Sequence, residues 1–228
     1  MSKIVFIDKN VVVINKDAGI SSQPDNTDGS SALENTAKLL KSLNEPYELY
    51  PVHRLDKVVG GLLIFARNKR TAAILSESVA DGDFSKNYVA VVEGKPEEGE
   101  YCDYLLKNSV LSKAQIVSPQ KKGAKEAKLI LSRISTVKTE KGEKSLVKIT
   151  LLTGRFHQIR AQLSGRCNSI VGDKKYGNKD GGARFPALFA YKISLKTGEL
   201  DIKASSLPDT DSYPWNLFEK ELYEELIK

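Results

Sequence analysis

Asp56 is the residue of this sequence best placed to do chemistry. It follows Arg54 by two positions and stands directly ahead of an apolar run that begins at Gly60. A carboxylate that attacks a substrate must be ionised, and a nearby guanidinium favours the charged form whereas an apolar flank disfavours it. We interpret Asp56 as a candidate catalytic carboxylate, with Arg54 or an approaching Arg155 as its cation. The alternative is a helix cap or a solvated loop carboxylate.

Both histidines of the chain lie in dense polar clusters next to predicted strands. His53 belongs to the sequence HRLD, and His157 belongs to TGRFHQIR. A single histidine in such a place is more often structural than catalytic, because buried polar groups are usually hydrogen-bonded. Two clusters that share Arg and His indicate a functional region.

The first third of the chain supplies elements that would position Asp56. Residues 3–7 and 11–14 are β-branched runs separated by Asp-Lys-Asn, which predicts two strands and a turn. Ser31 and Glu34 fit a capping box before a helix with Leu33, Ala37, Leu40 and Leu43 on one face. The run LLIFA predicts a buried strand. A helix follows it, with Ala72, Leu75 and Val79 at helical spacing and an end at Asp-Gly.

The remainder alternates strands with charged turns. Tyr88 opens a strand in NYVAVVEG, and AKLILSRIS and SLVKITLL should pair across KTEKGEK. Ile159 and Leu163 predict a helix, and residues 171–186 predict a surface loop. Two closing strands and a C-terminal helix with Phe218, Leu222 and Leu226 on one face complete the chain. We expect one α+β domain over residues 1–228.

Composition narrows the class of protein. With 228 residues, 40% hydrophobic and 28% charged, the chain is typical of a globular protein. Lys and Arg outnumber Asp and Glu by 35 to 29, which suits a polyanionic partner. Cys102 and Cys167 have no metal-ligand spacing, and the N-terminus has no apolar run of a signal peptide. We expect a cytoplasmic monomer with reduced thiols and no structural zinc.

Five separated segments carry a resemblance to a known family. They are VVVINKDAGI, HRLDKVVGGLLIFARN, KNYVAVVEG, TGRFHQIRAQLS and IVGDKKYG, in this order between about residue 10 and about residue 195. Together they resemble the RluA-type RNA pseudouridine synthases.

The resemblance implies a fold, an activity and a set of residues. The fold is α+β, a mixed, largely antiparallel sheet flanked by helices and loops, with a central active-site cleft. Asp56 would be the catalytic aspartate, Tyr88 the aromatic residue on the target base, and Arg155 the cation paired with the aspartate. Arg54 would contact the RNA around the extruded nucleotide, and Ile159 would line the pocket. The partner would be ribosomal or transfer RNA, ribosomal RNA being favoured, and no metal or other cofactor would be needed.

Three positions depart from the family pattern. Val59 and Gly60 replace the usual Thr-Ser, Gln162 replaces a His, and Asp17 replaces a Pro. Few residues precede the catalytic segments, so we expect no S4-like accessory domain and recognition of RNA by the catalytic domain or an assembled particle.

Three other functions compete with this interpretation. An inactive RNA-binding protein of the same fold would not need Asp56, Tyr88 and Arg155. A kinase would place its aspartate directly after His-Arg and would require a Gly-rich phosphate loop. A glycoside hydrolase would require a second carboxylate. Asp173 is the candidate for that carboxylate, and its Gly-rich context predicts a structural turn.

Overall fold

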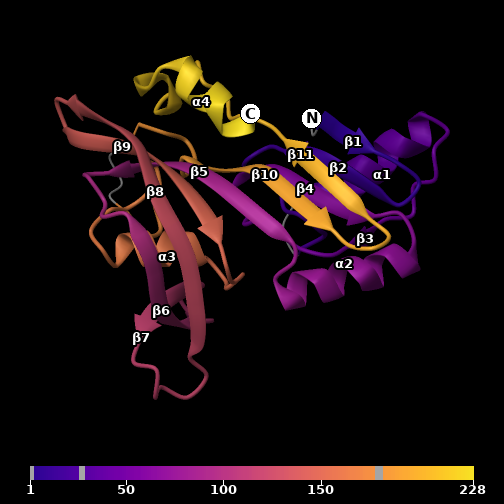
Figure 1. Ribbon diagram of the computed structural model, residues 1–228, viewed down its shortest axis with the longest axis horizontal. Helices are drawn as coiled ribbons and strands as arrows, with labels where there is room; N and C mark the ends of the chain where they lie inside the picture. The colour runs from indigo at the N-terminus through magenta and orange to yellow at the C-terminus, as the bar shows by residue number, and fades with distance from the viewer. Residues whose placement is uncertain (1–2, 26–28, 178–181) are drawn as a thin grey trace. The chain divides into compact units, whose positions relative to one another are not determined.

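The chain folds into two compact units in the computed structural model, which describes residues 3–25, 29–177 and 182–228 (Figure 1). The first unit comprises the chain up to Lys86 together with residues 189–208. The second comprises residues 87–188 and 209–226.

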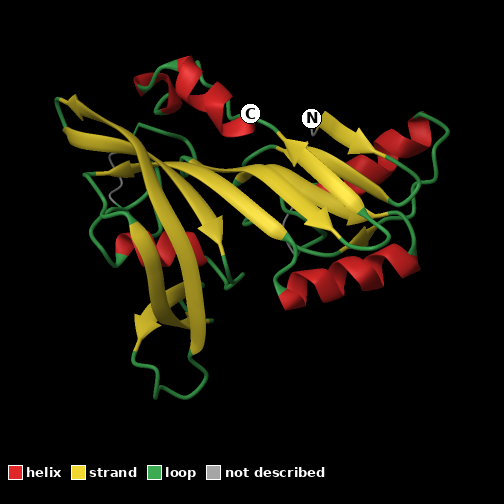
Figure 2. Ribbon diagram, in the orientation of Figure 1, coloured by secondary structure: helices red, strands yellow, loops and turns green. Residues whose placement is uncertain are grey.

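The first unit is built on a mixed sheet (Figure 2). Its strands are β1 (Lys3–Ile7), β2 (Val11–Lys16), β3 (Tyr50–Pro51), β4 (Gly60–Ala66), β10 (Leu188–Lys196) and β11 (Asp201–Ser205). Strand β2 pairs with β1 and β4 in antiparallel fashion, β4 pairs with β10 in parallel, and β11 pairs antiparallel with β10. The predicted hairpin at the N-terminus and the closing strand pair are confirmed.

Local sequence signals explain how the elements of this unit begin and end. Asp8 turns the first hairpin, because its Oδ1 accepts hydrogen bonds from the backbone nitrogens of Asn10 and Val11, both at 2.7 Å. Helix α1 (Ala32–Ser42) starts at the predicted capping box, in which Ser31 and Glu34 bond each other's backbone nitrogens. Helix α2 (Lys69–Asp81) is capped by Asn68 and ends at Gly82, whose φ of 88° is left-handed.

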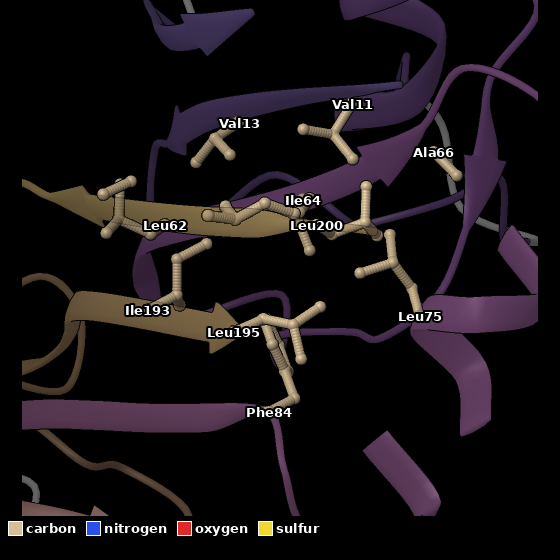
Figure 3. Close-up of a cluster of buried hydrophobic side chains, with 12 residues drawn as sticks. Val11, Val13, Leu62, Ile64, Ala66, Leu75, Phe84, Ile193, Leu195 and Leu200 are labelled. Atoms are coloured by element: carbon tan, nitrogen blue, oxygen red, sulfur yellow. The ribbon is translucent and has the colours of Figure 1, made fainter. Parts of the chain in front are cut away.

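A hydrophobic core joins the sheet to α2 (Figure 3). Val11 and Val13 of β2 lie beside Leu62 and Ile64 of β4, and Leu75 contributes the side chain from the helix. Every residue of β4 is buried, so the prediction of a buried strand after the charged loop is confirmed. The apolar run after Asp56 therefore anchors the loop that carries it.

The predicted face of the first helix is partly wrong. Ala32, Thr36 and Leu40 are its buried residues, whereas Leu43 is the C-cap and is exposed. Leu40 alone belongs to both the predicted face and the buried one. The spacing of apolar residues predicted a helix face one position away from the buried face, because the buried residue Thr36 is polar. The Thr36 hydroxyl donates to the Ala32 carbonyl at 2.7 Å.

Long antiparallel strands form the second unit. They are β5 (Ser85–Glu93), whose first two residues belong to the other unit, β6 (Gly99–Asn108), β7 (Lys113–Val117), β8 (Lys125–Thr139) and β9 (Gly142–Leu151). Strand β8 pairs with β9 and β6, and β6 pairs with β7 at the edge. The predicted pairing across KTEKGEK is confirmed, with Thr139 opposite Gly142.

Helix α3 (Gln158–Ser164) packs beside β6 and β7 (Figure 1). Ile159 and Leu163 are buried on it, which confirms the predicted helix. The predicted C-terminal helix is shorter than expected. Phe218 closes the 3-10 turn η1 (Trp215–Leu217), and α4 runs only over Lys220–Ile227, with Tyr223 as its buried residue.

The α+β fold class and the mixed, largely antiparallel pairing are confirmed. The loop predicted over residues 171–186 has neither helix nor strand in its described parts, and residues 178–181 lie outside them. The single domain and the central cleft stay predictions.

Candidate active site

Asp56 lies in the loop of residues 52–59, here called the Asp56 loop, which joins β3 to β4. The residue is partly buried, and its carbonyl accepts a hydrogen bond from the Val59 nitrogen at 3.0 Å, which closes a tight turn. Arg54 is in the same loop and is exposed to solvent. The loop thus presents a carboxylate and a cation just ahead of a fully buried strand.

Lys16 brings a buried positive charge to this loop. Its Nζ donates to the carbonyls of Ile20 at 2.8 Å, Asp17 at 3.1 Å and Lys57 at 3.4 Å. Burial lowers the pKa of Lys16 to about 8, while the negative charges of Asp56 and Asp17 act to raise it. Asp56 is therefore close enough to Lys16 to interact with it electrostatically. Sequence spacing did not identify this cation, because the two residues are far apart in the chain.

His53 has a structural role in the same loop. Its Nε2 accepts a hydrogen bond from the Ile64 nitrogen at 3.2 Å, and its ring packs on Phe84 with centroids 5.3 Å apart. Burial, and to a smaller degree the charge of Lys86, lowers the pKa of His53 to about 3. The imidazole is neutral at physiological pH and fastens the loop to β4.

Three of the predicted site residues belong to the second unit. Tyr88 lies on β5 and Ile159 on α3, and both are buried. Arg155 lies in the turn before α3, is exposed, and donates from Nε to the Glu126 carbonyl at 2.7 Å. Its backbone nitrogen donates to Oε1 of Gln158 at 2.9 Å, which fixes the entry to the helix.

Arg160 lies within α3 and has a different environment from Arg155. It is almost fully buried and donates from Nε and Nη2 to the two carboxylate oxygens of Asp173, at 2.7 and 2.8 Å. Asp173 also accepts from the nitrogens of Lys175 and Tyr176, which confirms its interpretation as a turn residue. The motif analysis did not select Arg160.

Tyr176 and His157 complete a polar cluster around α3. The Tyr176 hydroxyl and His157 Nδ1 share a hydrogen bond of 2.9 Å, and the Arg160 guanidinium lies over the Tyr176 ring at 5.0 Å. His157 also stacks on Phe156 with ring centroids 3.8 Å apart. The His157 cluster is thus an ordered network that supports the start of α3.

Comparison with known proteins identifies the family. The family model described as RNA pseudouridylate synthase matches residues 10–165. The chain belongs to this family. The segments that resemble the RluA-type enzymes fall largely within the matched range, and several relatives are named as large-subunit or tRNA pseudouridine synthases C and D.

Three of these relatives show how far the similarity extends. The tRNA pseudouridine synthase C of Haemophilus ducreyi is 32% identical over 182 residues, which cover 77% of this chain and 74% of the relative. The mitochondrial tRNA pseudouridine(32) synthase of Saccharomyces cerevisiae is 33% identical, with 78% and 37% covered. Ribosomal large subunit pseudouridine synthase D of Zymomonas mobilis is 31% identical, with 77% and 56% covered. The chain spans little more than half of this last relative and less of the yeast protein.

Solved structures of pseudouridylate synthase domains share the fold. Human RNA Pseudouridylate Synthase Domain Containing 1 aligns with a TM-score of 0.76 at 21% identity, over 99% of this chain and 94% of that one. Human RNA Pseudouridylate Synthase Domain Containing 4 aligns with a TM-score of 0.74 at 23% identity, over 91% and 89%. These likenesses support the fold alone.

One of the departures from the family pattern, Gln162, has a structural explanation. Gln162 is fully buried, and its Nε2 donates to Oδ2 of Asp103 at 2.8 Å and to the Ala127 carbonyl at 3.1 Å, so it ties α3 to β6 and β8. Val59 is buried directly after the Asp56 turn. The backbone carbonyl of Asp17 accepts a hydrogen bond from Lys16, but a proline would supply the same acceptor, so this bond does not explain the replacement. The replacement at 162 thus preserves a hydrogen-bonding side chain at a packing position.

The predicted site residues divide between the two units of the chain. Asp56 and Arg54 lie in the first, and Tyr88, Arg155 and Ile159 lie in the second. Each residue lies on the element, or next to the element, that the sequence predicted for it. Their assembly into one site stays a prediction.

Neither a membrane-spanning helix nor a metal cluster is found among the described residues. No described helix is long and apolar enough to cross a bilayer. In the same part of the chain, no group of three or more His, Cys, Asp or Glu side chains is placed to hold a metal ion.

Proposed function

We propose that this protein isomerises uridine to pseudouridine in structured RNA, with Asp56 as the essential catalytic residue. The observation that carries the proposal is the match of residues 10–165 to the RNA pseudouridylate synthase family, which includes the Asp56 loop. Asp56 is partly buried in that loop, next to the cation of Lys16.

The reaction needs the chemistry that a carboxylate can supply. The bond between N1 of uracil and C1′ of ribose breaks, the detached base turns, and a bond forms between C5 and C1′. N1 gains a proton and C5 loses one, so atoms balance and nothing is oxidised or reduced. The Asp56 carboxylate either attacks the sugar carbon or assists deprotonation of the sugar, and both routes require it to be ionised.

Tyr88 and Ile159 supply the environment for the base. An aromatic ring can stack on a detached uracil, and the tyrosine hydroxyl can handle a proton. Both side chains are buried. Residues that exclude water from a reacting base are expected to be buried in this way. Retaining the base beside the sugar makes formation of the new bond an intramolecular step.

Two cations complete the proposed site. Arg155 pairs with Asp56 in this account, and its exposed guanidinium has Nε engaged by the Glu126 carbonyl. Arg54 is exposed in the Asp56 loop and contacts the RNA around the flipped nucleotide. Flipping costs a few kcal/mol and costs least in loops, so we propose an unpaired or weakly paired uridine as target.

The proposed substrate is ribosomal or transfer RNA, with ribosomal RNA favoured. Several relatives are named as ribosomal large subunit pseudouridine synthases, including those of Zymomonas mobilis and Rickettsia bellii, and two are named as tRNA pseudouridine synthases. The net charge of +6 suits either polyanion. We propose that the protein acts as a monomer in the cytoplasm and needs no cofactor.

The test uses RNA labelled with tritium at C5 of uracil, because that position loses its hydrogen when the carbon–carbon bond forms. The purified wild type should release tritium from ribosomal or transfer RNA made without modification. Asp56→Asn should bind the same RNA and release none. Asn has nearly the same volume as Asp and keeps one side-chain oxygen as an acceptor, so the substitution should leave the fold intact.

The inactive RNA-binding alternative predicts a different outcome. Such a protein would bind the RNA with a salt-dependent affinity and release no tritium as wild type. Equal rates of tritium release by wild type and by Asp56→Asn would contradict the assignment of Asp56. The proposed activity would still be supported.

A further inference from the structure

Ser22 makes a paired contact with the residue that precedes Asp56. Its hydroxyl accepts a hydrogen bond from the Leu55 nitrogen at 3.0 Å and donates one to the Leu55 carbonyl at 2.9 Å. Both residues are buried, at 6% and 4% exposure. One side chain thus bonds both the N–H and the C=O group of Leu55, as the backbone of a neighbouring strand would do.

The residue on the other side of Asp56 is held by the same segment of chain. The Lys57 carbonyl accepts from the Gly19 nitrogen at 2.7 Å and from Lys16 Nζ at 3.4 Å. The backbone is therefore bonded to segment 16–22 immediately before and immediately after Asp56. Two fixed flanking peptides limit where the carboxylate between them can point.

Helix α1 in turn fixes Ser22. The carbonyl of Ser22 accepts from the Leu33 nitrogen at 3.2 Å, and the carbonyl of Ser21 accepts from the Ala32 nitrogen at 2.8 Å. These two donors belong to the first turn of α1, whose nitrogens have no partner within the helix. The helix start, Ser22 and the Asp56 loop therefore form one continuous hydrogen-bonded path.

Serine has the chemistry that this position requires. A hydroxyl both donates and accepts, so it can bond an N–H and a C=O group at once. Alanine here would leave two buried backbone groups of Leu55 without these bonds, and the loop would have to move toward water to satisfy them. The movement would displace Asp56, the next residue.

We propose that Ser22 is a positioning residue that sets the place of Asp56 for the reaction. The inference rests on the proposed function, since it concerns the turnover that Asp56 performs. Ser22 touches neither the RNA nor the reacting atoms in this account. It acts through the Leu55 backbone.

Steady-state tritium release from RNA labelled at C5 of uracil tests the proposal. Ser22→Ala should lower kcat by about tenfold to a hundredfold, the loss expected of a small displacement of a reacting group, with KM changed by less than about twofold. Ser22→Thr keeps the hydroxyl and should restore kcat. Hydrogen exchange of the Leu55 amide should become faster in Ser22→Ala and return toward the wild-type rate in Ser22→Thr.

Ser78→Ala is the matched control for stability. Ser78 is also buried in the first unit, and its hydroxyl donates to the Ile74 carbonyl of α2 at 2.9 Å. This variant loses a buried hydrogen bond within α2 and none to the Asp56 loop, so its unfolding temperature should fall while kcat stays at the wild-type value. Should Ser22→Ala fail to fold, Ser22→Cys, which weakens both bonds at similar volume, takes its place in the comparison.

The outcomes separate this inference from the proposed function. An active wild type with unchanged kcat in Ser22→Ala, or with equal losses in Ser22→Ala and Ser22→Thr, overturns the positioning role and leaves the activity standing. A wild type that releases no tritium overturns the proposed function, and the positioning role falls with it.

Discussion

The carboxylate of Asp173 accepts two hydrogen bonds from the guanidinium of Arg160, at 2.7 Å from Nε and 2.8 Å from Nη2. Both side chains are buried, at 4% exposure for Arg160 and 0% for Asp173. A buried ion pair of this geometry satisfies each charge through the other. It joins α3 to the segment IVGDKKYG, and both belong to the family pattern.

Breaking this pair should destabilise the second unit. Asp173→Asn leaves a buried guanidinium without its counter-charge, so we expect the free energy of unfolding to fall by about 3 kcal/mol. Urea unfolding provides the measurement. Glu126→Gln is the control, because the Lys128–Glu126 pair is partly exposed, so its loss should lower the free energy of unfolding much less than loss of the buried pair. Equal effects of the two substitutions would contradict the structural role of the buried pair.

The stability of the protein should depend on the protonation of His53. Burial lowers its folded pKa to about 3, whereas in the unfolded chain the imidazole takes a proton below the ordinary value of 6.5. The unfolded state therefore binds more protons than the folded state between these values. The stability that His53 contributes is fully present above pH 6.5 and is lost as the pH falls toward 3, at about 1.4 kcal/mol per unit.

His53→Gln isolates this effect. Its side-chain carbonyl can accept the hydrogen bond from the Ile64 nitrogen but does not titrate, so its stability should fall less between about pH 7 and about pH 4.5 than that of wild type. Urea unfolding at these two pH values gives the two slopes. Parallel slopes for both proteins would show that His53 does not carry the acid dependence.

Gly61 should be irreplaceable for two separate reasons. Its φ of +114° is unfavourable for other residues, and a Cβ would lie 2.5 Å from the Ala190 nitrogen of the adjacent strand. Gly82→Ala is a matched control, because its φ is +88° and a Cβ there meets nothing within 4 Å. We expect Gly82→Ala to cost about 1 kcal/mol and Gly61→Ala several kcal/mol. Thermal unfolding compares them, and similar losses would refute the close approach of β4 and β10.

The assignment of Arg155 is tested by its own substitution. Arg155→Ala should lower the rate of tritium release at least about tenfold, because the cation proposed to pair with Asp56 would be lost, and Arg155→Lys should retain part of the activity. Lys138→Ala is the control. It removes an exposed charge from the C-terminal end of β8 and should leave turnover unchanged. Full activity in Arg155→Ala would reject the assignment and direct the same test to the buried Arg160.

Local sequence signals predicted most elements of the fold. The turn at Asp8, the capping box at Ser31 and the glycine at position 82 act within four residues of the element they bound. Errors arose where burial did not follow apolar spacing. Thr36 is buried although it is polar, and Leu43 is exposed because the helix has ended there.

Local sequence signals did not predict contacts between distant parts of the chain. Ser22 bonds Leu55 across 33 positions, and Lys16 bonds Lys57 across 41. Lys16 lies within the segment VVVINKDAGI that carries the family resemblance, but neither its type and spacing nor those of Ser22 indicate a bond to the loop at Asp56. The motif resemblance selected Asp56 as a candidate but not the side chains that hold its loop, because those bonds run to backbone atoms, which every residue type provides.

Mapping of pseudouridine in cells tests the central claim most directly. Cells that lack the protein should lose pseudouridine at one or a few uridines of ribosomal or transfer RNA, and expression of the wild type should restore them. Expression of Asp56→Asn at the same level should restore none. Restoration by Asp56→Asn, or an unchanged map in cells that lack the protein, would contradict the account.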